Sequence, residues 1–127
     1  MGTRATIGLV KGDQVEYIGL CKNGYPEHAG AILKEHYNTP DKIQQLLNMG
    51  ELSVLGIDIG EKHKFVAFCG DSQCTFFIRD RNETSDEFKS RTISLSDWDK
   101  ECTHDYNYIF NNGGWRCRDR TGGLLDG

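Results

Sequence analysis

The sequence has few of the patterns that normally identify a reaction or a metal site. Its five cysteines include no C-x₂-C pair, so a zinc site is not expected. No catalytic triad and no nucleotide-binding loop names an activity by its spacing. No apolar run approaches the roughly 18 residues that span a bilayer. We therefore expect no metal, no cofactor and no membrane insertion.

Basic charge is also scarce, with 15 Lys and Arg residues against 19 Asp and Glu residues and a net charge of −4. Bulk nucleic-acid binding needs a basic surface, so it is not expected, although a local basic pocket is compatible with this charge. The 127 residues are enough for one domain. We place this domain at residues 1–120 and expect residues 121–127 to form a flexible C-terminal tail. The absence of a secretory signal favours the cytoplasm.

The cysteines allow two interpretations. Cys69 and Cys74 flank a predicted turn, where a disulfide bridge could form. Without an export signal, reduced and partly buried thiols are the favoured alternative.

Alternating apolar residues predict three hairpins. Their strands are expected at Thr3–Val10 with Gln14–Leu20, Phe65–Cys69 with Cys74–Arg79, and 106–110 with Trp115–Arg120. One helix is expected over Pro26–Tyr37, a second after the N-cap Thr39 and Pro40, and a short third one after Ser96. The predicted fold class is α+β, a single domain with an antiparallel sheet and two main helices and one short helix packed on one face.

Arginines alternate along the last predicted strand. Arg116, Arg118 and Arg120 should point to one face, and Trp115 and Cys117 to the other. A row of guanidinium groups is well suited to hold phosphate, because each group offers a planar fork of donors. A charged edge strand that prevents aggregation is the alternative interpretation.

Three further arginines are candidates for the same site. Arg79 and Arg81 end the predicted Cys74–Arg79 strand, and they would join Arg116 and Arg118 if the two strands were neighbours. Surface ion pairs with nearby aspartates are the alternative, and such pairs contribute little. Arg4 lies on an early strand that is otherwise apolar, so its charge is expected to be functional or paired.

The segment Cys21–Gly30 joins a strand to a helix. Pro26 fits the first helical position, which places Tyr25 and His28 near free backbone N–H groups and the positive end of the helix dipole. This arrangement favours an anion pocket with an aromatic ring and an imidazole. We find no partnered nucleophile for His28, so a binding or structural role is favoured over a catalytic one.

Several linked segments together resemble a family of small, largely uncharacterised proteins that tailed bacteriophages and prophages encode. The family pattern includes a Thr-Arg-Ala-Thr-Ile strand, a Gly-Tyr-Pro-Glu-His-x-Gly element, a Glu-His-Tyr segment and a Gly-Glu-Lys-His segment. The matching segments are Gly2–Ile7, Cys21–Gly30, Leu33–Pro40, Gly50–His63, Ile78–Glu83 and Asp105–Trp115. One departure is the shorter Lys22-Asn23-Gly24 turn, where many members carry His-Trp-Asp-Gly.

The resemblance implies a phage accessory protein that acts in the cytoplasm of an infected bacterial host. Such proteins often counter host defence, and some hold an immune nucleotide signal in a pocket without cleaving it. We therefore expect a non-enzymatic anti-defence protein that sequesters a small phosphorylated nucleotide. The expected ligand-binding residues are Arg4, Tyr25, His28, Arg79, Arg81, Arg116 and Arg118.

Two alternatives belong to other classes. One is an enzyme that cleaves such a signal, with His28 and either Glu27 or His36 in acid–base roles. The other is an inhibitor that binds a host defence protein through an exposed face. A homo-oligomer is compatible with each of these functions.

Overall fold

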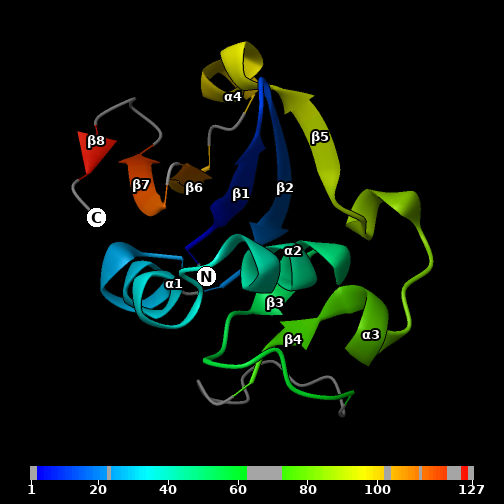
Figure 1. Ribbon diagram of the computed structural model, residues 1–127. Helices are drawn as coiled ribbons and strands as arrows, with labels where there is room; N and C mark the ends of the chain where they lie inside the picture. The colour runs from blue at the N-terminus through cyan, green and yellow to red at the C-terminus, as the bar shows by residue number, and fades with distance from the viewer. Residues whose placement is uncertain are drawn as a thin grey trace.

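The computed structural model describes residues 3–22, 24–62, 73–101, 104–111, 113–119 and 124–125, which form one sheet with helices around it (Figure 1). The strands are β1 (Ala5–Lys11), β2 (Gln14–Leu20), β3 (Leu52–Val54), β4 (Thr75–Phe76), β5 (Arg91–Ser94), β6 (Tyr106–Asn111), β7 (Gly114–Asp119) and β8 (Leu124–Leu125). The helical segments are η1 (Pro26–Gly30), α1 (Ala31–His36), α2 (Pro40–Asn48), α3 (Phe77–Arg81), η2 (Asp86–Phe88) and α4 (Leu95–Glu101).

The sheet is mixed, which corrects the expectation of an antiparallel one. Its order is β4-β3-β2-β1-β6-β7-β8, and β5 pairs with β2 outside this path. The predicted hairpins β1–β2 and β6–β7 are both present and antiparallel. However, β1 is parallel to β6, and β2 is parallel to β3. Local alternation predicts hairpins well, but it carries no information about which hairpins become neighbours.

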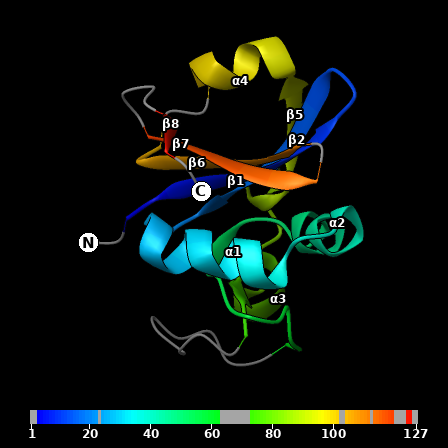
Figure 2. The ribbon, with the colours of Figure 1, turned by 60° about the vertical axis from the view of Figure 1, so that its left-hand side comes forward.

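Helices cover both faces of the sheet, which corrects the expectation of a single covered face. Figure 2 shows α1 and α2 on one side of β1 and β6, and α4 on the other. Ile7 and Leu9 of β1 belong to the main core on the α1 and α2 side. Val10 packs against the smaller cluster formed by Val15 and Trp98. Because β1 is buried on both faces, its sequence is nearly continuously apolar instead of strictly alternating.

Two of the expected helices begin where the sequence predicts. The helix expected over Pro26–Tyr37 is present as η1 followed directly by α1. The Thr39 side chain accepts a hydrogen bond from the Lys42 N–H, and Pro40 is the first residue of α2. The third helix, α4, begins at Leu95, so the expected cap Ser96 lies inside it.

The strand expected over Cys74–Arg79 is wrong beyond Phe76, because α3 begins at Phe77. The buried carboxylate of Asp80 accepts a hydrogen bond from the Phe76 N–H at 2.8 Å, which fixes the first turn of the helix. Asn82 ends the helix in the left-handed conformation, at a φ of 62°. These contacts override the β propensity of the local sequence.

The remaining expectations concern the strand before Cys74, the possible disulfide bridge and the C-terminal tail. The strand expected over Phe65–Cys69 lies outside the described residues, and so does the cysteine that would bridge to Cys74. Leu124 and Leu125 of the expected tail form β8 and pair with β7.

Candidate functional site

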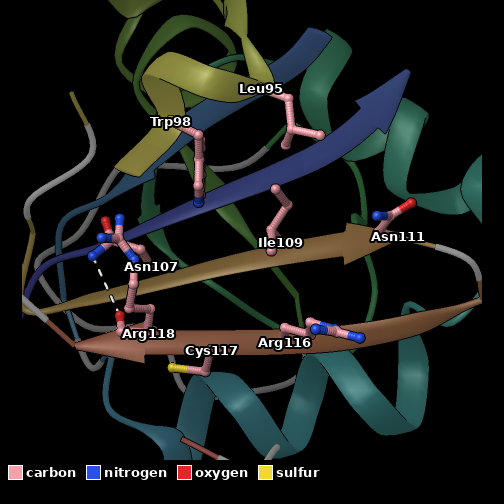
Figure 3. A pocket seen from close by; sticks show the side chains of 8 residues that line it. All are labelled: Leu95, Trp98, Asn107, Ile109, Asn111, Arg116, Cys117 and Arg118. Carbon is pink, nitrogen blue, oxygen red and sulfur yellow. Dashed lines mark hydrogen bonds between the residues drawn. The ribbon is translucent and has the colours of Figure 1, made fainter. Parts of the chain in front are cut away.

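A pocket of about 310 Å³ lies between α4 and the β6–β7 hairpin. Figure 3 shows Leu95 and Trp98 reaching from α4 toward the sheet, with Asn107 and Arg118 side by side at one end. The lining residues are Leu95, Trp98, Asn107, Ile109, Asn111, Arg116, Cys117 and Arg118. The pocket is large enough for a group of mononucleotide size, since typical ligand pockets begin at about 300 Å³.

The two arginines reach this pocket because of the strand alternation. Arg116 is exposed and Arg118 is half-buried, and both line the pocket on the α4 face. Trp115 instead packs against the main core on the opposite face, and Cys117, although it also lines the pocket, belongs to that core and directs its sulfur away from α4 (Figure 3). The predicted division of β7 into two faces is therefore confirmed for these four residues, whereas Arg120 lies outside the described residues.

Trp98 forms the roof of the pocket and is only 4% exposed. Its ring meets the Tyr17 ring edge-on, with centroids 5.8 Å apart. Beneath it, β1 has a glycine: a Cβ atom on Gly8 would lie 2.8 Å from Val15 and 3.0 Å from the indole. Helix α4 is held in this position at its first residue, because the Leu95 N–H donates to the Asp13 carbonyl oxygen at 2.8 Å.

Asn107 is a buried polar residue in the pocket lining, with 1% exposure. Its amide nitrogen donates to the carbonyl oxygens of His104 at 3.1 Å and of Arg118 at 3.3 Å. Its Oδ1 atom has no hydrogen-bond partner among the residues that the structure describes. A buried acceptor without a partner is uncommon, because leaving it unsatisfied costs about 1–3 kcal/mol.

This arrangement favours binding over chemistry. Two guanidinium groups can donate to a phosphate, and Leu95, Trp98 and Ile109 provide apolar lining beside them. The described lining contains no carboxylate, hydroxyl or imidazole that could act as an acid, base or oxygen nucleophile, and its one thiol, that of Cys117, is buried in the main core. Across the described residues there is also no group of three or more side chains suited to hold a metal ion.

Tyr25 and His28 are placed close together, as the sequence indicates. Their ring centroids lie 5.9 Å apart, with Tyr25 37% exposed at the start of η1. They lie on the other face of the sheet from the α4 pocket, since Ala29 of η1 packs into the main core. Gly24 is tied to the same region, because its carbonyl oxygen accepts a hydrogen bond from the Tyr108 hydroxyl at 2.7 Å. These two aromatic residues therefore form a separate surface feature.

Arg79 and Arg81 do not join Arg116 and Arg118. They lie on α3 beside β4, and three strands of the ordered sheet separate β4 from β6. Arg81 is exposed, and its Nε donates to the Glu83 carboxylate at 2.6 Å. Of the five arginines that could have converged, the four that the structure describes are thus divided between different parts of the sheet.

Arg79 holds the backbone around it. Its side chain is 11% exposed, and both its Nε and Nη2 donate to the buried Asp80 carboxylate. The remaining guanidinium bonds reach carbonyl oxygens at 2.9–3.0 Å, those of Ile59, Gly60 and Cys74. With its donors engaged in this way, Arg79 acts as a clamp between α3 and the segment that follows β3.

Arg4 lines a second, much smaller cavity of about 60 Å³, together with Glu51 and His104. The Glu51 carboxylate accepts a hydrogen bond from the Gly19 N–H. Burial raises the pKa of Glu51, and the Gly19 N–H and the charges of Arg91 and Arg4 offset this only in part. Burial and the Arg4 charge lower the pKa of His104. The cavity therefore brings together a carboxyl and an imidazole that are both shifted toward their neutral forms.

Sequence reasoning missed Trp98 and Asn107 as site residues. One signal for Asn107 is present in the sequence: residues between Tyr106, Tyr108 and Phe110 must face away from them, toward the face that carries the β7 arginines. The observed register confirms this relation, pairing Asn107 with Arg118 and placing Ile109 opposite Arg116. No local signal shows that α4 crosses over this face.

Comparisons of the chain with known protein families, curated proteins and solved structures find no match. Within the described part of the chain, no helix is both long enough and apolar enough to cross a membrane. The assignment of the candidate site is therefore based only on the structure of this chain.

Proposed function

We propose that this protein binds a small phosphorylated nucleotide in the α4 pocket and sequesters it without cleaving it. The observation that carries the proposal is the position of Arg116 and Arg118 on the face of β7 that lines the pocket beneath Trp98. The guanidinium groups would hold phosphate, and the indole would pack against the base. In a protein with a net charge of −4, one basic pocket would favour a small anion over a long polyanion.

The biological setting belongs to the same proposal. The resemblance to proteins of tailed phages and prophages supports an accessory protein in the cytoplasm of an infected bacterium. A phosphorylated nucleotide in that compartment would be an immune signal of the host, and its sequestration would counter the defence. Binding without chemistry fits a described pocket lining that lacks an acid, a base and an oxygen nucleophile. A homo-oligomer is compatible with this function.

The experiment is incubation of the purified protein with candidate nucleotides, followed by heat denaturation and analysis of the released compound. Sequestration predicts that bound nucleotide is removed from solution and recovered with its mass unchanged. Recovery of a hydrolysed product would show that the protein is an enzyme. If no nucleotide is removed from solution and a stoichiometric host protein co-purifies, the protein is an inhibitor of that partner instead.

Cleavage of the signal is a second candidate function, and the small cavity beside Arg4 favours it. A carboxyl with a raised pKa and an imidazole with a lowered pKa are typical of acid–base pairs. However, about 60 Å³ admits only a group the size of a few atoms, whereas the α4 pocket is about five times larger. Sequestration is therefore the better supported function, and Glu51→Gln would abolish turnover only if the cavity were catalytic.

A further inference from the structure

The buried oxygen of Asn107 indicates which chemical group of a ligand would lie at its end of the α4 pocket. Asn107 belongs to the lining of the pocket and is 1% exposed, and no described residue donates to its buried Oδ1 atom. Folding removes such an atom from water, so its lost hydrogen bonds are costly unless a bound group replaces them. A ligand that donates a hydrogen bond here would recover this cost on binding.

The orientation of the Asn107 amide is fixed by its own donors. Both hydrogens of the amide nitrogen are directed to main-chain carbonyl oxygens, those of His104 at 3.1 Å and Arg118 at 3.3 Å. The side chain can therefore offer only its oxygen to a ligand. This excludes the two-bond pairing in which an asparagine both donates to and accepts from an adenine.

The positions of the other lining residues place the base and the phosphate. Figure 3 shows Asn107 at one end of the pocket, beside Arg118, with Arg116 farther along β7 and Trp98 above. Arg116 is exposed, so a charged phosphate there would keep part of its hydration. Ile109 packs against the cluster of Val15 and Trp98, so a flat base would lie beside this apolar wall, with its edge toward Asn107.

We propose that Asn107 is the specificity-determining residue of this pocket, and that it selects a nucleobase with an exocyclic amino group. The proposal rests on the proposed function and names the ligand class for the same site. An amino group donates to Oδ1, whereas a ring carbonyl in the same place would set two acceptors against each other. A base without any group at that position would leave the buried oxygen unpaired.

Two pairs of nucleotides test this in the unmodified protein. Adenosine 5′-monophosphate differs from purine riboside 5′-monophosphate only by its amino group, and guanosine 5′-monophosphate differs from inosine 5′-monophosphate in the same way. We expect the amino-bearing member of at least one pair to bind about 10- to 100-fold more tightly in a calorimetric titration. Equal affinities within both pairs would overturn the proposal and leave the proposed function standing. If none of the four nucleotides binds, the proposed function itself fails.

Two variants then assign the discrimination to Asn107. Asn107→Leu has a similar size but no acceptor, so the difference within the discriminating pair should fall to less than about threefold. Asn111→Leu changes the other asparagine of the lining and should preserve the difference, whatever its effect on affinity. Preserved discrimination in Asn107→Leu would contradict the proposal. If Asn107→Leu does not fold, as its thermal melt would show, the two ligand pairs in the unmodified protein remain the test.

Discussion

Asn107 and Arg118 face each other across the β6–β7 hairpin, and the side-chain amide of Asn107 donates to the main-chain carbonyl oxygen of Arg118 at 3.3 Å. This bond joins a buried amide of one strand to the strand that carries the pocket arginines. Both residues are held by regular sheet pairing and not by a loop. A site built on paired strands keeps its geometry before a ligand arrives, which reduces the entropy lost on binding.

The pocket arginines provide the first prediction. Replacing both Arg116 and Arg118 by alanine should abolish the rise in melting temperature that a bound nucleotide causes. The reason is that the variant lacks both guanidinium groups that would hold the phosphate. Differential scanning fluorimetry with and without nucleotide measures the effect, and the melting transition itself shows that the variant is folded.

Arg81→Ala is the matched control for the double variant. Arg81 is also an exposed arginine, but it lies on α3 near the other end of the sheet and pairs with Glu83. Its removal should leave the ligand-induced stabilisation unchanged. If both variants lost the ligand-induced stabilisation equally, the ligand would bind outside the α4 pocket.

The second prediction concerns the contact between β1 and the roof of the pocket. Gly8→Ala would place a methyl group 2.8 Å from Val15 and 3.0 Å from Trp98, so one of them must move. We expect a loss of about 1–3 kcal/mol in the free energy of unfolding, measured by urea denaturation. Gly114→Ala is the control, because nothing lies within 4 Å of its added Cβ. A Gly8→Ala protein as stable as Gly114→Ala would contradict the observed position of α4.

The third prediction separates Arg79 from the ligand site. Arg79→Ala leaves the fully buried Asp80 carboxylate without its guanidinium partner. Removing one member of a buried ion pair costs about 3–5 kcal/mol, whereas the exposed Arg81 pair should cost less than about 1 kcal/mol. Urea denaturation of the two alanine variants makes the comparison. At a low temperature, where Arg79→Ala remains folded, the variant should still bind nucleotide. Loss of nucleotide binding under these conditions would show that Arg79 contacts the ligand.

The fourth prediction is a pH dependence from Glu51. Burial raises the pKa of this carboxyl above its usual 4.5 in the folded protein. A carboxyl whose pKa is raised by folding stabilises the folded protein at pH values below the pKa that it has in the unfolded chain. This contribution is lost as the pH rises through the higher pKa of the folded protein. Glu51→Gln is neutral at every pH and avoids this loss. The free energy of unfolding of the variant, minus that of the wild type, should therefore increase between pH 4 and pH 7.

Urea denaturation at several pH values gives this difference directly. Glu87→Gln supplies the baseline, since Glu87 is exposed on η2. A difference for Glu51→Gln that stays flat or falls with rising pH would show that folding does not raise the pKa of this carboxyl.

Much of the local structure could be predicted from the sequence. The hairpins β1–β2 and β6–β7, the Thr39 cap and the two faces of β7 follow from residue periodicity and turn chemistry, which act over a few neighbouring residues. The expected strand through Phe77 failed because contacts distant in the sequence settle that segment. Arg79 donates hydrogen bonds to the carbonyl oxygens of Ile59 and Gly60, about 20 residues away. The segment around Arg79 makes these bonds as a helix and not as a strand.

The candidate site was predictable only in part, for the same reason. The β7 arginines are visible in the sequence, since alternation alone gives their common face. Their neighbours depend on the parallel pairing of β1 with β6 and on the passage of α4 over Gly8. Seven residues were expected to form one site, but the sheet order divides them among the α4 pocket, η1, α3 and the cavity beside Arg4. Pairing between distant strands is a property of the whole fold.

Native mass spectrometry tests nucleotide sequestration in the α4 pocket most directly. The wild type and the Arg116→Ala, Arg118→Ala variant would be purified from infected, defence-positive bacterial cells and weighed before and after denaturation. We predict that the wild type carries a bound compound with the mass of a phosphorylated nucleotide, releases it intact, and that the variant carries none. A wild type without bound nucleotide, or equal loading of both proteins, would contradict this function for the pocket.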